Sequence, residues 1–160
     1  MGPMIADEFI IREASGADMP GIAHVRSSVT ENLLTIEQLA QRGITNASIA
    51  ASLLANSKGW VAERSGQIVA FSMADRADPS IFALFVLPGY EGRGLGNRLL
   101  DLALGWLWDN GAELVWLTTS PETKAARFYA RRGWVPTGMA PRGDMRFELR
   151  RPASLQGRPR

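Results

Sequence analysis

Apolar residues are concentrated in one long stretch, residues 81–108, which is interrupted once by a glycine-rich turn. The segment before the turn, residues 80–87, is almost entirely apolar and shows no alternation, which predicts a strand covered on both faces. Pro88 lacks an N–H group, so strand pairing should stop there. After the turn, polar positions recur at helical spacing along one narrow side, which predicts a long helix beginning near Arg93 or Gly94.

The turn itself contains Gly89, Gly92, Gly94 and Gly96. Glycine permits the close approach of a ligand, and a helix start presents free N–H groups with the positive end of its dipole. Together they predict an anion site, most often for phosphate, although the glycines alone would fit a plain tight turn equally well. The spacing matches neither the dinucleotide fingerprint nor the P-loop. The prediction requires that these amides are not already bonded to the protein's own carbonyls.

The rest of the chain alternates between short strands and helices. We expect Ser15 to cap a first helix, with Asp18 as the second partner of an imperfect capping box. Asn46 or Ser48 should cap a second helix, and Asn110 with the following glycine should end the long one. Further strands are expected at residues 9–12, 60–63, 67–73, 113–119, 134–135 and 145–149.

The resulting order of elements is β-α-α-β-β-β-α-β-α-β-β. The strand at residues 80–87, the long helix and the strand at 113–119 imply a parallel pair with a right-handed crossover. Hairpins make the remaining pairs largely antiparallel, so we expect an α/β protein with a mixed sheet. No linker divides the chain, so residues 1–150 are interpreted as one domain and residues 151–160, rich in proline, glycine and polar residues, as a flexible tail.

Composition excludes several classes of function. A chain of 160 residues with 46% hydrophobic and 21% charged residues is typical of one soluble globular domain. The net charge of +2 is too small to indicate nucleic-acid binding. There is no cysteine and only one histidine, so neither a disulfide, a thiolate nucleophile nor a metal site is expected. No stretch approaches the ~20 apolar residues of a membrane span, so we expect a cytoplasmic protein without a membrane partner.

The order V-x-P-x-x-x-G-R-G-x-G around the turn resembles the acetyl-CoA motif of the GNAT N-acetyltransferases, usually written [QR]-x-x-G-x-[GA]. The predicted order of elements is similar to the GNAT acyltransferase fold over about residues 9–149. Glu91 departs from the motif, because the family has Gln or Arg there, and a carboxylate beside a pyrophosphate would be unfavourable. We therefore expect Glu91 to point outward. The matching residues are Val86, Pro88, Gly92, Arg93, Gly94 and Gly96.

A second run, residues 122–134, resembles the family's signature N-x-x-A-x-x-[FL]-Y-x-x-x-G-[FW]. Glu122 stands where the family usually has Asn, which often helps to hold the pantetheine arm, so that contact is in doubt. The run should form a helix capped by Ser120, with Pro121 at its first position, ending at Arg132. On packing grounds alone its aromatic residues would be core. The matching residues are Ala125, Phe128, Tyr129, Gly133 and Trp134.

The resemblance implies that acetyl-CoA is the co-substrate and supplies an acetyl group for an amine. With no cysteine there is no obvious acyl-enzyme, so direct attack by the amine is expected. Tyr129 is the expected general acid for the thiolate, because a phenol with a pKa of about 10 stays protonated at neutral pH. The general base is left open among Glu31, Asp75, His24 and a water. The implied coenzyme-binding residues are Leu84, Phe85, Val86, Glu91, Gly92, Arg93, Gly94, Leu95, Gly96 and Asn97.

The acceptor is not set by either motif. The main hypothesis is a primary amine of a small molecule; the alternatives are a protein N-terminal or lysine acetyltransferase and an acyl-CoA-binding module without turnover. The presence of Tyr129 argues mildly against the module. In the family the early helices and late loops select the acceptor, which here are residues 31–45 and 136–144. The resemblance leaves a homodimer open, since such domains are often dimers.

Overall fold

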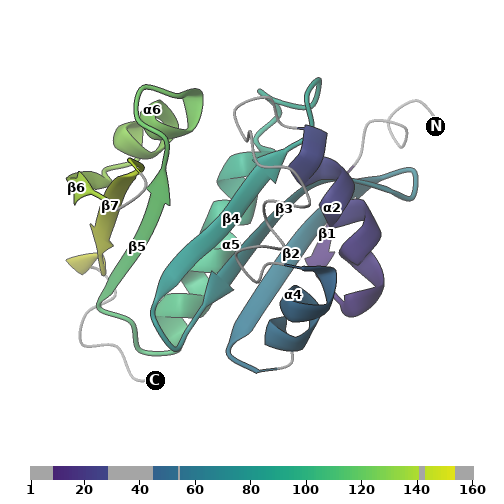
Figure 1. Cartoon of the computed structure of the whole chain (residues 1–160), viewed down its shortest axis with the longest axis horizontal. Helices are drawn as coiled ribbons and strands as arrows, with labels where there is room; N and C mark the ends of the chain where they lie inside the picture. The colour runs from purple at the N-terminus through teal and green to yellow at the C-terminus, as the bar shows by residue number, and fades with distance from the viewer. Residues whose placement is uncertain (1–8, 29–44, 54, 141–142, 154–160) are drawn as a thin grey trace.

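The computed structural model describes residues 9–28, 45–53, 55–140 and 143–153, which form one seven-stranded sheet with helices on both faces (Figure 1). The strand order is β1-β2-β3-β4-β5-β7-β6, and only the pair β4 and β5 is parallel. The strands are β1 (Ile10–Glu13), β2 (Ser57–Arg64), β3 (Gln67–Asp75), β4 (Ser80–Val86), β5 (Leu114–Thr119), β6 (Val135–Met139) and β7 (Met145–Arg150). The helices are η1 (Gly16–Asp18), α2 (Met19–Ser28), α4 (Asn46–Leu53), α5 (Leu95–Asp109) and α6 (Lys124–Arg131). The predicted α/β class, mixed sheet and order of elements are confirmed.

Two hydrophobic clusters hold helices to the two faces of the sheet. In Figure 1, α2 and α4 lie in front of strands β2 to β4, and α5 lies behind them. The front cluster is centred on Ile22, Val25 and Phe71. The rear cluster is larger and includes the apolar stripe of α5, whose helical spacing was evident in the sequence. The buried residues of that stripe are Leu95, Leu99, Leu100, Ala103, Leu107 and Trp108.

Strands β4 and β5 are joined at one end only. Ser80 pairs with Trp116, and within the described residues no second pair continues this ladder. Beyond that pair β5 leans away from β4 toward the end of the sheet where both strands finish (Figure 1). Each strand therefore has one edge whose N–H and C=O groups are not used by the other, while β3 and β7 occupy the outer edges of the two strands.

A β-bulge lies at the start of β4. Met73 of β3 pairs with Ala83, but the next residue, Ala74, pairs with Ile81, so Phe82 is an extra residue in β4. Such an insertion bends its strand and increases its twist, which accounts for the divergence from β5. The expectation of a strand covered on both faces is therefore wrong for part of its length. Phe82 is 45% exposed, and the side chains of residues 84–87 are only half-buried.

The first helical segment begins with the predicted capping box. The N–H of Ser15 donates to Asp18 Oδ2 at 2.8 Å, and the N–H of Asp18 donates to the backbone carbonyl of Ser15. Arg12 of β1 donates to both carboxylate oxygens of Asp18 at 2.9 Å. This partner lowers the pKa of Asp18. The box therefore also ties the helix start to the first strand.

Helix α4 begins at Asn46, earlier than either predicted cap allows. Thr45 is its N-cap: Thr45 Oγ1 accepts from the N–H of Ser48 at 3.0 Å, and Ser48 Oγ accepts from the N–H of Thr45 at 2.8 Å. This is a reciprocal capping pair with Ser at the third helical position. The expectation that Asn46 or Ser48 is the cap was wrong, because Thr45 forms the same pair one step earlier.

Helix α6 starts later than predicted. Thr123 is its N-cap and accepts from the N–H of Ala126 at 3.1 Å, so Ser120 is not the cap and Pro121 is not helical. The carbonyl of Ser120 instead accepts from the Thr123 hydroxyl at 2.8 Å. Glu122, between them, has φ of 62°, a left-handed conformation that favours Gly or Asn. The chain needs this turn to leave β5 and enter the helix.

The predicted tail does not begin at Arg151. This residue is 6% exposed, and its guanidinium donates to the carbonyls of Trp108 at 2.8 Å and Ala112 at 3.1 Å. It thereby satisfies carbonyls at the C-terminal end of α5, where a cation is also favoured by the helix dipole. Residues 154–160 lie outside the described part of the chain. Among the described helices, none has the length and apolar character needed to cross a bilayer.

Candidate functional site

The glycine turn connects the free end of β4 to the start of α5. The Leu87 N–H donates to Val69 and closes the ladder with β3, after which the chain leaves the sheet. Gly89, Gly92 and Gly94 have φ of 97°, 78° and 81°, a region that L-residues rarely adopt. A Cβ added at any of the three would meet nothing within 4 Å. The glycines are therefore required by backbone conformation, and open space surrounds them.

The anion-site prediction requires that the amides of this turn are not already bonded to the protein's own carbonyls, and this condition is met. Gly94 is the N-cap of α5 and has no side chain to bond the first N–H groups. Among the described residues, none of the N–H groups of residues 91–97 donates a hydrogen bond of regular geometry, whereas the next one, of Arg98, donates to Gly94. No acidic side chain lies in the first turn of α5. These donors and the positive end of the helix dipole suit an anionic ligand.

The guanidinium groups of Arg93 and Arg64 lie beside the turn, against the ring of Tyr90. The Arg93 guanidinium lies 5.5 Å from the ring centre of Tyr90, and that of Arg64, from the end of β2, lies 5.9 Å from the same ring. Arg64 also lies over Phe9 at 5.7 Å. Cation–π contacts of this kind hold both charges beside the amides. Tyr90 and Arg64 could not be predicted as neighbours from the sequence, because the end of the hairpin and the turn meet only in the folded chain.

Glu91 is exposed, as expected from its place in the motif, but it does not simply point away. Its Oε1 accepts from the N–H of Gly89 at 3.2 Å. The carboxylate is thereby held on the strand side of the turn, before the unbonded amides begin. The Glu91 carboxylate, which would be unfavourable beside a bound anion, is therefore bonded to the amide of Gly89 in the same loop.

The edge of β4 offers backbone groups toward β5. Since the N–H of Leu87 bonds to β3, the alternation of an antiparallel ladder directs the backbone groups of Phe85 to β3 as well. Those of Leu84 and Val86 then face the opposite edge, where β5 has diverged. Of the three predicted strand residues, two present their main chain at the edge of β4 that β5 leaves unpaired. Phe85 contributes a ring that packs on Phe71 at 5.5 Å.

Helices α5 and α6 approach each other next to the turn. A Cβ on Gly96 would lie 3.6 Å from the Phe128 ring, which is ordinary contact, so larger side chains would meet the ring. Asn97 and Leu95 belong to the first turn of α5, with Leu95 buried in the core. The two predicted motifs, separated by a strand in the sequence, are therefore neighbours in space.

Tyr129 of α6 is 6% exposed and surrounded by aromatic rings. Its ring lies 5.3 Å from Phe128, 5.6 Å from Trp134 and 6.3 Å from Phe147. Burial raises the pKa of Tyr129 above its ordinary value near 10, so the phenol stays protonated throughout the neutral range. Among the described residues, its hydroxyl forms no hydrogen bond, which leaves a proton donor available for a ligand.

Of the residues considered as a base, Asp75 lies away from this site. Asp75 pairs with Ser80 at the far end of β4, about 20 Å along the strand from Val86 at ~3.3 Å per residue. His24 is exposed on α2, where its backbone carbonyl accepts from nearby serine hydroxyls. Glu31 lies outside the described residues. No cluster of three or more metal-binding side chains occurs in the described ranges.

The chain was compared with known protein families and structures. The model of the acetyltransferase (GNAT) family matches residues 30–134. Uncharacterized N-acetyltransferases of Mycobacterium bovis and Mycobacterium tuberculosis are 36% identical to the chain over 81 residues, which is 48% of this chain and 52% of theirs. The chain thus spans about half the length of the curated relatives that it matches.

Solved structures share the fold over nearly the whole chain. PaiA N-acetyltransferase from Thermoplasma acidophilum, in complex with coenzyme A, superposes with a TM-score of 0.78 at 14% identity, covering 90% of this chain and 99% of that one. YncA, a putative acetyltransferase from Salmonella typhimurium with its cofactor acetyl-CoA, gives 0.70 at 18% identity, covering 90% and 94%. At these identities the likeness shows the fold alone.

Proposed function

Because the chain belongs to the acetyltransferase (GNAT) family, as its two motifs predicted, we propose that it transfers the acetyl group of acetyl-CoA to a primary amine of a small molecule. The observation that carries this proposal is the run of unbonded amides at residues 91–97, on a helix start without a side-chain cap. The two relatives solved with coenzyme A or acetyl-CoA share this fold and support the choice of ligand.

The turn and its arginines fit the pyrophosphate of the coenzyme. Backbone donors of Gly92 to Asn97 would bind the phosphate oxygens, and the positive end of the α5 dipole would favour their charge. Arg93 and Arg64 would add two fixed cations beside Tyr90. Glu91 is already turned onto Gly89 and so would not oppose the anion.

The diverging edge of β4 fits the amide-bearing arm of the coenzyme. Leu84 and Val86 carry main-chain donors and acceptors at the spacing of a strand edge, where β5 gives no partner. An extended arm with amide groups can bond to such an edge as an added strand would. The thioester end would then lie between the two strands, near the buried face of α6 that carries Tyr129.

The thioester supplies an acyl group activated for attack by an amine. Without a cysteine for an acyl-enzyme, we propose direct attack: the neutral amine nitrogen forms a bond to the carbonyl carbon, and the C–S bond breaks. The chain's part is then chiefly to hold the two reactants in line. Since Asp75 lies at the far end of β4, we propose a water as acceptor of the amine proton.

Tyr129 is proposed as the proton donor to the departing thiolate. Its raised pKa keeps the proton on the phenol until sulfur develops negative charge. A thiol has an ordinary pKa of about 8.5, so transfer from a phenol would be uphill in water. The apolar surroundings of Phe128 and Trp134 disfavour the thiolate as well as the phenolate, so burial also raises the pKa of the departing thiol and offsets the rise at Tyr129.

A direct test measures thiol release from acetyl-CoA with a panel of small primary amines, amino acids, peptides with free N-termini and lysine peptides. The proposal expects release with a small amine and none without an acceptor. Release only with peptides would shift the acceptor class, and coenzyme binding without release on any amine would support a binding module. Absence of coenzyme A binding by calorimetry would end the proposal.

Replacing Tyr129 with Phe tests the proton donor. We expect kcat to fall about 100-fold, in the usual range for a general acid, while the Kd of acetyl-CoA stays the same. The other tyrosine is a matched control: Tyr90→Phe keeps the ring between the two arginines and should keep kcat. Because burial raises the pKa of Tyr129, the wild-type rate should not fall through tyrosine ionisation up to about pH 10. An unchanged kcat in Tyr129→Phe would remove this residue from the mechanism.

A further inference from the structure

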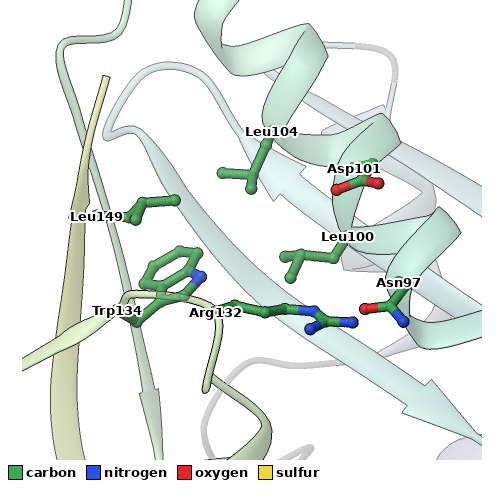
Figure 2. Close-up of a pocket in the computed structure, with 7 residues that line it drawn as sticks. All are labelled: Asn97, Leu100, Asp101, Leu104, Arg132, Trp134 and Leu149. Carbon is green, nitrogen blue, oxygen red and sulfur yellow. The ribbon is translucent and has the colours of Figure 1, made fainter. Parts of the chain in front are cut away.

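A groove lined in part by Trp134 lies between α5 and the C-terminal part of the chain (Figure 2). Its volume is about 340 Å³, at the lower end of the range for small-molecule sites. The lining residues are Asn97, Leu100, Asp101, Leu104, Arg132, Trp134 and Leu149.

Two buried polar atoms in this groove have no partner. Trp134 is 3% exposed, and its indole Nε1, a donor only, forms no hydrogen bond in the described structure. Asn97 Oδ1, an acceptor, is likewise buried and without a partner. Buried polar atoms are nearly always hydrogen-bonded, and these are the only two such side-chain atoms found among the described residues. Both atoms line the same groove, so one bound molecule would be able to bond to both.

The groove carries charged groups of both signs, together with hydrogen-bond donors and acceptors. Trp134 and Arg132, from the C-terminal part, present only donors, and the Arg132 guanidinium is held 4.4 Å from the Phe128 ring and extends across the groove toward α5 (Figure 2). Asn97 and Asp101, one helical turn apart on α5, present an amide oxygen and a carboxylate. The three leucines supply the apolar surface between the walls.

We propose that this groove binds a free aliphatic α-amino acid. Its carboxylate would accept from Trp134 Nε1 and the Arg132 guanidinium, and its ammonium would donate to Asn97 Oδ1 and the Asp101 carboxylate. The aliphatic side chain would pack on Leu100, Leu104 and Leu149. This arrangement satisfies both buried atoms with one small molecule and matches each charge of the ligand with a charge of opposite sign.

The site is distinct from the proposed transfer chemistry. The main-chain donors of the turn and the Tyr129 hydroxyl are not needed for it; Asn97 contributes its side chain here and its N–H there. A failure of this inference would therefore leave the proposed acetyl transfer unaffected, and the two can be measured separately.

Isothermal titration with L-leucine, in the absence and in the presence of saturating coenzyme A, tests the inference. Leucinamide, which lacks the carboxylate, and 4-methylpentanoate, which lacks the ammonium, serve as matched ligands. We expect saturable binding of leucine under both conditions, with each analogue at least about tenfold weaker, since each loses a charged hydrogen-bonding group. Trp134→Phe, which keeps the ring and removes the donor, should weaken leucine binding by a similar factor.

Asp101→Asn is a second variant, on an exposed residue whose change should not disturb folding. It should weaken leucine about tenfold and leave thiol release unchanged, whereas Asp109→Asn, elsewhere on the same helix, should change neither. No saturable binding of leucine, binding that neither variant weakens, or binding abolished by saturating coenzyme A would overturn the inference. The last result would assign the groove to the coenzyme itself.

Discussion

Helices α5 and α6 meet at the candidate site, where Gly96 faces the Phe128 ring, yet they begin in opposite ways. At the start of α6, the Thr123 side chain accepts from the N–H of Ala126. At the start of α5, the N-cap is Gly94 in a left-handed conformation, with no side chain and no bond to the first amides. An uncapped helix start usually costs stability, so the difference fits the proposed role of the α5 amides in binding the coenzyme.

The other described helix starts resemble α6 and not α5. Ser15 and Asp18 form a capping box at the first helical segment, and Thr45 and Ser48 form a reciprocal pair at α4. In the described part of the chain these helix starts are therefore capped by side chains. The start of α5, which carries the first motif, is not. Mutations at the capped and the uncapped helix starts should therefore separate effects on coenzyme binding from effects on stability.

The largest expected effect is at Gly94. Gly94→Val cannot adopt φ of 81° without strain and should redirect the neighbouring amides. Losing two hydrogen bonds to a charged ligand, at about 1.5–3 kcal/mol each, would raise the Kd of coenzyme A about 100-fold or more. Titration calorimetry measures this. Gly105→Ala, inside the same helix and with open space around it, should bind normally and unfold at a higher temperature. Normal binding by a folded Gly94→Val would refute the role of the turn.

Next in size is the capping box at Asp18. Asp18→Ala removes the cap and the carboxylate bonded by Arg12, and should lower the free energy of unfolding by about 2 kcal/mol. Because its pKa is lower in the folded chain than the unfolded value of about 3.9, this stabilisation is complete above that pH and is lost as pH falls through the folded value. Urea unfolding at pH 7 and pH 3 should show the difference shrinking. Glu13→Ala, in an exposed ion pair, should change stability by less than ~1 kcal/mol at either pH.

A smaller loss is expected at the capped start of α6. Thr123→Ala leaves the N–H of Ala126 without its acceptor and should cost about 1 kcal/mol of unfolding free energy, read from chemical denaturation. Thr123→Ser keeps the acceptor and should remain near wild type. If Thr123→Ala lowered coenzyme affinity as strongly as Gly94→Val does, the distinction between a structural and a ligand-binding helix start would not hold.

The smallest expected effect is a gain. Glu122 precedes that cap with φ of 62°, and Glu122→Gly should relieve the strain and raise the melting temperature slightly, by about 0.5–1 kcal/mol in stability. Glu122→Ala, which has a Cβ as Glu does, should give no gain. A Glu122→Gly variant that loses stability would show that the glutamate side chain makes a contribution larger than its backbone strain.

The sequence was sufficient for the order of elements and for the two motifs. The glycines of the turn and the helical spacing of α5 are local features, so each could be interpreted without knowing its neighbours. The helix caps could not be predicted from the sequence alone, because chemically equivalent candidates lie within three residues of each other. These are Ser120 and Thr123 at α6, and Thr45 and Ser48 at α4. Which one is used depends on where the chain must turn to leave the preceding element, and that is decided by tertiary structure.

The parts that could not be predicted depend on long-range contacts. Nothing in residues 80–87 indicates that Phe82 forms a bulge, because a bulge is a property of the pairing with β3. The stacking of Arg64 on Tyr90 joins segments from β2 and the glycine turn. The unbonded Nε1 of Trp134 is likewise defined only by what surrounds it. Motifs locate the chemistry in the chain, while the fold determines which side chains complete it.

The single residue pair that joins β4 to β5 has a consequence for how the molecule opens. Strands β1 to β4 form one continuous ladder, and β5, β7 and β6 form another, with Ser80 and Trp116 as the junction. Amide hydrogen exchange should therefore resolve two cooperative units, each with its own opening free energy. A coenzyme bound between them would tie these units together, so its presence should slow exchange on both sides of the junction at once.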